Sequence, residues 1–116
     1  MKGLQITVTQ ERGVTIASVT GEVDLSNGLH LSDEVLARMP DDSLGLVIDL
    51  DALEYIDSAG VRSLFEIAHT LDLRGIRLAI AVREDSPLRS VLKVTRTDEV
   101  ASLHSDRDAA IAALAG

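Results

Sequence analysis

A serine and an aspartate stand side by side where an aliphatic stretch of the sequence gives way to a helical pattern. The segment Ile56-Asp57-Ser58-Ala59-Gly60 follows the apolar run at 44–50. Segments that join a buried strand to a helix commonly carry function. The small residues after the serine leave the expected helix start uncrowded, so its unpaired backbone N–H groups would attract an anion. We therefore predict that the Ser58 hydroxyl can carry a phosphate.

A phosphate on Ser58 would act on binding rather than on catalysis. It adds about −1.5 to −2 charges and three acceptor oxygens in one step. Glu54 and Asp57 lie beside it in the sequence, so the modified surface would repel an acidic or apolar partner without any change of fold. The alternative is that Asp57 or Ser58 only caps the helix, an interpretation that assigns no function to either residue.

Serine hydrolysis is the first competing interpretation, because the nucleophile of some hydrolases also stands between a strand and a helix. That motif has a glycine two residues before the serine, where this chain has Ile56. His69 lies eleven residues beyond Ser58 on the same expected helix, a rise of about 16 Å, and therefore cannot serve as its base. The sequence alone does not place His30 and His104. Since the geometric partners of a hydrolase are not apparent, we expect no catalytic residues.

An aspartate phosphoswitch with a bound metal is the second competing interpretation. Asp49 and Asp51 flank the end of the aliphatic run, but no acidic pair follows the first expected strand. The only lysines are Lys2 and Lys93, so the charges that would hold a metal-bound phosphoaspartate are not visible. No glycine-rich phosphate loop is visible in the sequence either, so any ATP should belong to a partner. We expect a protein that is not an enzyme and that has no metal or cofactor of its own.

Composition limits the partners and the location that the chain can have. Its 116 residues, 46% of them hydrophobic, are enough for one core, so we expect a single domain over residues 1–116. Nineteen acidic against eleven basic residues give a net charge of −8, which disfavours nucleic acid and anionic membranes and favours a protein partner. The sequence has no cysteine, no visible export signal and no apolar run long enough to span a bilayer, which predicts a cytoplasmic protein without a membrane partner.

Hydrophobic periodicity predicts the elements that position Ser58. Two short β-branched segments at 4–8 and 14–19 indicate an antiparallel hairpin. The aliphatic runs at 44–50 and 76–82 indicate strands buried on both faces of a sheet. Between these runs lies a helix that ends near Gly75. Its apolar stripe consists of Val61, Leu64, Phe65, Ala68 and Leu71. The centre of the chain is therefore a β-α-β unit.

Three further helices and one edge strand complete the prediction. A first helix is expected over 26–39, and Ser86-Pro87 has the order of an N-cap and a first helical residue. A short edge strand is expected at 100–103, and the spacing of Ser105 and Asp108 predicts a capping box before the last helix. The pattern predicts an α/β fold, with a mixed β-sheet of four to five strands, an N-terminal hairpin and about four helices.

The stretch VIDLDALEYIDSAGVRSL, residues 47–64, resembles the signature of STAS domains in bacterial anti-sigma-factor antagonists. Gly21-Glu22-Val23-Asp24 stands where that family has a turn after its N-terminal hairpin, and the order of elements matches over almost the whole chain. The resemblance implies the STAS fold. It also implies that Ser58, in the family's Asp-Ser-small-Gly motif, is phosphorylated by a partner serine kinase that is itself an anti-sigma factor.

The resemblance further implies a function in partner switching. The unphosphorylated protein would bind the anti-sigma factor, which also binds the ATP, and would thereby release the sigma factor. Phosphorylation at Ser58 would block this binding, and a phosphatase would reverse it. The docking surface would combine the motif with residues before the first helix and at the start of the second. It would consist of Asp24, Ser26, Asp57, Ser58, Ala59, Gly60, Val61 and Arg62.

STAS domains also serve as scaffolds in stress-sensing assemblies and as parts of transporters. The alternative function is therefore a phosphate-independent protein-interaction module of such an assembly. Two departures from the family pattern bear on the choice of partner. Val61 stands where many members have leucine, and residues 26–30, SNGLH, differ from the commoner threonine-rich start of the first helix.

Overall fold

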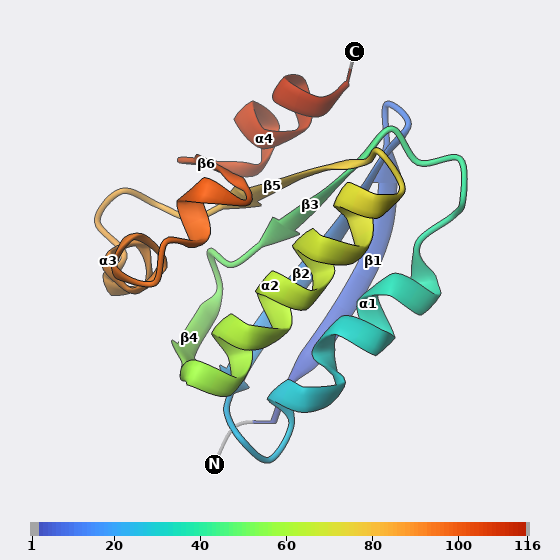
Figure 1. Ribbon diagram of the computed structural model, residues 1–116. Helices are drawn as coiled ribbons and strands as arrows, with labels where there is room; N and C mark the ends of the chain where they lie inside the picture. The colour runs from blue at the N-terminus through green and yellow to red at the C-terminus, as the bar shows by residue number, and fades with distance from the viewer. Residues whose placement is uncertain (1–2, 116) are drawn as a thin grey trace.

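The computed structural model describes residues 3–115 as a six-stranded mixed sheet with helices on both faces (Figure 1). The strands lie in the order β1-β2-β3-β5-β6, with β4 beside the end of β2, and only β1 runs antiparallel to its neighbour. The predicted α/β class, hairpin and mixed sheet are confirmed, although the sheet has one strand more than the upper number expected. The strands are β1 (Gln5–Glu11), β2 (Val14–Val23), β3 (Gly45–Asp49), β4 (Leu53–Ile56), β5 (Arg77–Ala81) and β6 (Ser102–His104). Residues 1, 2 and 116 of the expected domain lie outside the described residues.

Four α-helices cover the sheet in the described part of the chain. They are α1 (Leu31–Arg38), α2 (Ser58–Leu73), α3 (Pro87–Val94) and α4 (Arg107–Leu114). Two short 3-10 turns are also present: η1 (Gly28–His30) precedes α1, and η2 (Thr97–Glu99) lies between α3 and β6. Helices α1 and α2 lie on one face of the sheet and α4 on the other (Figure 1). The sheet therefore separates a large apolar cluster from a smaller one beneath α4. No helix within residues 3–115 is long and apolar enough to cross a membrane.

The hairpin turn explains how the first two strands come together. Arg12 and Gly13 have φ angles of 54° and 80°, and Glu11 pairs with Val14 across them. Two successive left-handed residues match the right-handed twist of the strands that they connect. Both strands are longer than the β-branched segments predicted, because pairing extends them beyond the apolar residues.

Strand β2 has two different parallel neighbours along one edge. Its first half pairs with β3 and its end pairs with β4, with a shift of register between Gly21 and Glu22. Gly21 has a φ of +92°, and a Cβ there would overlap the carbonyl oxygen of Gly3, so this irregularity requires glycine. The resemblance placed a turn at Gly21, but β2 continues through Val23 and the turn begins at Asp24.

Two expected helix boundaries are wrong and one strand was not expected, because hydrogen bonds of nearby groups hold the chain differently. The first helix begins at Leu31 rather than at residue 26, since a hydrogen-bonded turn and η1 come first. The N-cap of α4 is Asp106, whose Oδ1 accepts the Ala109 N–H at 2.8 Å, whereas the Ser105 hydroxyl donates to Glu84. Strand β4 lies in a segment expected to be a connection, and it exists because the end of β2 offers it a free edge.

Candidate functional site

Ser58 is exposed and is the first residue of α2. Strand β4 ends at Ile56, so Asp57 alone separates the strand from the helix, and its extended backbone (φ −108°, ψ −171°) makes the change of direction. The helix begins three residues before Val61, the first residue of the predicted apolar stripe. The hydroxyl therefore lies at an exposed end of the sheet, where the turn at 24–27, the end of β4 and the start of α2 meet. We call this end of the molecule the rim. A second protein can reach the hydroxyl there.

The carboxylate of Asp57 makes three hydrogen bonds that fix this rim. Its Oδ1 accepts the backbone N–H groups of Ala59 and Gly60 at 2.9 and 3.3 Å, which caps the helix. Its Oδ2 accepts the backbone N–H of Leu25 at 3.1 Å. The expectation that these helix N–H groups are unpaired and would attract an anion is wrong, because Asp57 already occupies two of them. A phosphate on Ser58 would instead lie close to a carboxylate.

The turn at 24–27 is held by side-chain hydrogen bonds. The Asn27 Oδ1 accepts the Asp24 N–H at 2.9 Å, and its Nδ2 donates to the Glu22 carbonyl at 3.0 Å. The hydroxyl and the N–H of Ser26 both donate to Oδ1 of Asp24. These bonds, the hydroxyl first, hold the pKa of Asp24 below its ordinary value. Asp24 is therefore a fixed negative charge in a turn that Asp57 ties to α2.

Two glycines allow this turn to pack directly on the start of α2. A Cβ on Gly28 would lie 3.1 Å from the backbone nitrogen of Gly60. A Cβ on Gly60 would lie 2.5 Å from Cγ1 of Ile56 and 2.7 Å from Cγ1 of Val23. The β2–β4 pairing brings Val23 opposite Ile56, so the glycine of the Asp-Ser-Ala-Gly motif has a packing role beneath the hydroxyl.

Most of the predicted docking residues come together at this rim, but not all of them face solvent. Ser26 and Ser58 are exposed, and Arg62 lies one turn further along α2 with its side chain 77% exposed. Ala59 and Gly60 are buried beneath the surface. Val61 is only 7% exposed and belongs to the apolar core, so it offers little surface to a partner.

Three exposed apolar side chains accompany the rim and were missed from the sequence. Leu25 is 70% exposed, Leu29 is 54% exposed and Tyr55 is 49% exposed. Leu25 follows Asp24 directly, and Tyr55 pairs with Glu22 at the end of the sheet. An apolar residue in the sequence is first expected to be buried, so only the fold shows that these side chains face water. Exposed apolar area beside an exposed hydroxyl is suited to contact with another protein.

A metal site is not evident in the part of the chain that the structure describes. Within residues 3–115, no three side chains of His, Cys, Asp or Glu are placed to hold an ion.

Comparison with known proteins identifies the family. The family model described as the STAS domain matches residues 5–110. The chain belongs to the STAS domain family. The resemblance of residues 47–64 to this family is thus confirmed, and so is the STAS fold.

Several proteins similar to this STAS domain are named as anti-sigma factor antagonists. RsfB of Mycobacterium tuberculosis, an anti-sigma-F factor antagonist, is 34% identical over 61 residues, which make up 53% of this chain and 50% of RsfB. The matching part thus spans only half the length of RsfB. The crystal structure of an anti-sigma factor antagonist from Mycobacterium paratuberculosis has a TM-score of 0.85 at 26% identity, and covers 98% of this chain and 96% of that one. An anti-sigma-factor antagonist (STAS) domain protein from Planctomyces limnophilus has a TM-score of 0.77 at 25% identity, and covers 94% and 96%.

Proposed function

We propose that this STAS domain is an anti-sigma-factor antagonist that binds its anti-sigma factor only while Ser58 is unmodified. The observation that carries the proposal is the exposed Ser58 hydroxyl at the first residue of α2, next to a capping carboxylate. The names of RsfB and of the Mycobacterium paratuberculosis protein support it. Binding of the anti-sigma factor frees the sigma factor, so the state of one hydroxyl sets transcription.

The partner supplies the catalysis in this scheme. The anti-sigma factor is a serine kinase that binds ATP and transfers its γ-phosphoryl group to Oγ of Ser58, which loses its proton, while ADP leaves. The STAS domain, which we take to be a single domain, contributes the acceptor hydroxyl and no catalytic group. An opposing phosphatase restores the hydroxyl. These steps take place in the cytoplasm, with no contact of this chain with nucleic acid or membrane.

Phosphorylation blocks docking through charge and desolvation. The dianion stands beside Asp57 and the turn that holds the ionised Asp24, so the rim gains about two negative charges where two are already fixed. Docking would bury the apolar side chains of Leu25 and Tyr55 together with this phosphate, and an uncompensated buried charge is strongly unfavourable. The fold itself need not change.

Ser58→Asp and Ser58→Ala test the proposal, with binding to the purified anti-sigma factor measured by calorimetry. Ser58→Asp should weaken the affinity at least about tenfold, because like charges brought together at an interface cost several kcal/mol. Ser58→Ala should bind like the unmodified protein and should take up no phosphate from ATP, as intact mass shows. The matched control is Ser90→Asp, which adds the same charge at an exposed serine of α3 and should bind normally.

Equal affinity of Ser58→Asp and the unmodified protein would refute the proposal. So would peptide mapping that places the phosphate on another residue. A protein that binds its partner but never takes up phosphate would instead be a phosphate-independent interaction module of a larger assembly.

A further inference from the structure

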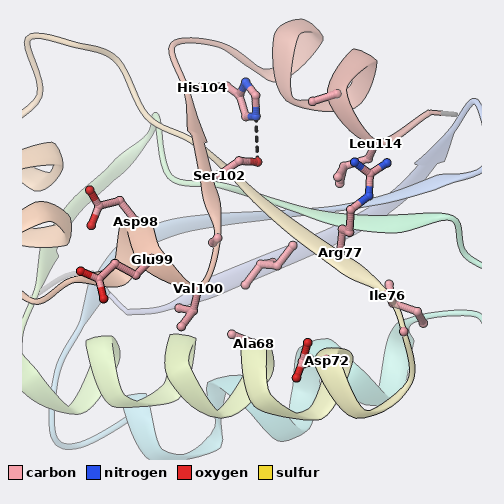
Figure 2. A pocket seen from close by; sticks show the side chains of 14 residues that line it. Ala68, Asp72, Ile76, Arg77, Asp98, Glu99, Val100, Ser102, His104 and Leu114 are labelled. Carbon is pink, nitrogen blue, oxygen red and sulfur yellow. Dashed lines mark hydrogen bonds between the residues drawn. The ribbon is translucent and has the colours of Figure 1, made fainter.

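A hollow lies at the other end of α2 from Ser58, against the edge of the sheet (Figure 2). Its volume is about 650 Å³, and it adjoins a second hollow of about 430 Å³ that shares Ala68, Asp72, Glu99 and Val100. We call these two hollows together the distal groove. Helix α2 forms its floor in the view of Figure 2, β6 one wall, and β5 with Leu114 of α4 the other.

The groove exists because the last strand of the sheet is short. Strand β6 pairs with Ala79–Ala81 of β5, whereas Arg77 and Leu78 pair with β3 alone among the described strands. In a parallel ladder successive residues direct their backbone groups to alternate sides. One of these two residues therefore turns its N–H and C=O toward the groove, where an extended segment of another chain can pair with them.

Acidic and apolar groups share the lining. Val100 is 42% exposed and supplies the apolar surface, whereas Ala68 and Leu114 line the groove but are almost fully buried. Asp72 points into the groove from α2, whereas Asp98 and Glu99 lie on the far side of Val100 from Asp72 (Figure 2). Within residues 3–115, the carboxylates of Asp72 and Asp98 make no ion pair or side-chain hydrogen bond.

The basic groups of the lining leave these acids available. Glu99 has only a long contact with Arg96, at 3.8 Å between two exposed side chains, which contributes little. The Arg77 guanidinium lies beside Leu114, away from Asp72, and His104 is bonded to Ser102 (Figure 2). The groove therefore combines an apolar surface with free negative charge.

We propose that the distal groove binds an extended peptide segment of another protein through an arginine or lysine side chain. The segment pairs with the open edge of β5, the aliphatic stem of its basic side chain lies on Val100, and the charged head meets Asp72. Long basic side chains combine these two kinds of contact. A second copy of this chain, with its net charge of −8, and polyanions are disfavoured by the same acids.

The distal groove can be occupied together with the rim at Ser58. Asp72 lies fourteen positions beyond Ser58 on α2, a distance of about 21 Å along the helix. A phosphate would block binding at the rim, whereas the distal groove recognises a positively charged side chain. Peptide binding at the distal groove is therefore independent of the function proposed for Ser58.

Titration of ¹⁵N-labelled protein with a blocked pentapeptide, Thr-Val-Arg-Val-Thr, followed by amide chemical shifts, tests the proposal. Saturable shifts are expected at Arg77, Leu78 and Ser102, and the same peptide with glutamate in place of arginine should produce none. Asp72→Asn should weaken the affinity about threefold to fivefold, the effect of one exposed ion pair. The change should not unfold the protein, because a carboxylate near a helix C-terminus is unfavourable for the helix.

Asp33→Asn is the matched control, because it removes one exposed carboxylate from α1 and should leave the affinity unchanged. The proposal is overturned if the arginine peptide produces no saturable shifts, or if the shifts centre on the rim at Ser58. Equal weakening by Asp72→Asn and Asp33→Asn would also overturn it, since the attraction would then be a property of the net charge.

Discussion

Asp57 joins the turn at 24–27 to α2, and removing its carboxylate should loosen both. Asp57→Ala deletes the cap on Ala59 and Gly60 together with the bond to the Leu25 N–H. A cap contributes about 1 kcal/mol, and a hydrogen bond to a charged group contributes about 1.5 kcal/mol at the lower end of its range. We therefore expect Asp57→Ala to lower the free energy of unfolding by about 2.5 kcal/mol, which leaves the protein folded.

Asp106→Ala is the matched control, because Asp106 caps α4 through one bond to Ala109 and ties no second segment. It should lower the free energy of unfolding by only about 1 kcal/mol. Asp57→Asn separates the two roles of Asp57. Asparagine caps a helix as well as aspartate does. Its single carbonyl oxygen cannot accept hydrogen bonds both from the N–H groups of α2 and from the Leu25 N–H. If the oxygen caps the helix, the NH₂ group faces the Leu25 N–H and cannot accept its hydrogen bond. This variant should keep the cap and lose the tie.

Urea unfolding and amide hydrogen exchange measure these effects. The Leu25 amide should exchange about tenfold faster in both Asp57 variants, since a tenfold change corresponds to about 1.4 kcal/mol, and it should be unchanged in Asp106→Ala. If Asp57→Ala and Asp106→Ala lowered the free energy of unfolding equally and left Leu25 exchange unchanged, the tie would contribute nothing and the reasoning would be refuted.

Two further predictions concern the packing and the charge of the same rim. Gly60→Ala should lower the free energy of unfolding, measured in urea, by about 1 kcal/mol. Overpacking against Ile56 and Val23 costs about 2 kcal/mol, and the gain in helix propensity returns about 1 kcal/mol. An unchanged or raised free energy of unfolding would show that these two side chains move aside freely. Ser26→Ala should raise the pKa of Asp24 in an NMR titration, because the hydroxyl is the main group that lowers it. Folding lowers the pKa of Asp24, so the bonds from Ser26 stabilise the folded protein only while Asp24 is ionised. The free energy of unfolding lost in Ser26→Ala should therefore be largest above the pKa of Asp24 in the unfolded chain, and should vanish as the pH falls through its pKa in the folded protein. An equal loss at all pH values would contradict this.

The elements that local chemistry determines could be predicted from the sequence. The aliphatic run at 44–50 contains β3, whose every residue is buried. Ser86 accepts the Leu88 N–H at 3.2 Å as the N-cap of α3, and Gly75 has the left-handed φ of +70° expected after a helix. Each of these signals lies within a few residues of the structure that it determines.

Contacts between distant residues set the limit of that prediction. Strand β4 shows no periodicity, since Glu54 and Tyr55 are exposed between buried ends, and only the free edge of β2 makes it a strand. The Asp57–Leu25 bond joins residues 32 apart, so the sequence indicated a capping aspartate but not the segment that it would tie. Leu29 lies within the range 26–39 expected to be the first helix, but it is exposed in η1, before α1 begins.

The two parallel neighbours of β2 determine which part of the sheet can unfold locally. Because β3 holds the first half of β2 and β4 holds only its end, the rim can open locally while the central strands keep their pairing. The register shift at Gly21 marks the boundary between the β2–β3 pairing and the β2–β4 pairing. Partial unfolding confined to the β4 pairing would appear as a separate group of fast-exchanging amides, while the amides of β3 and β5 stay protected.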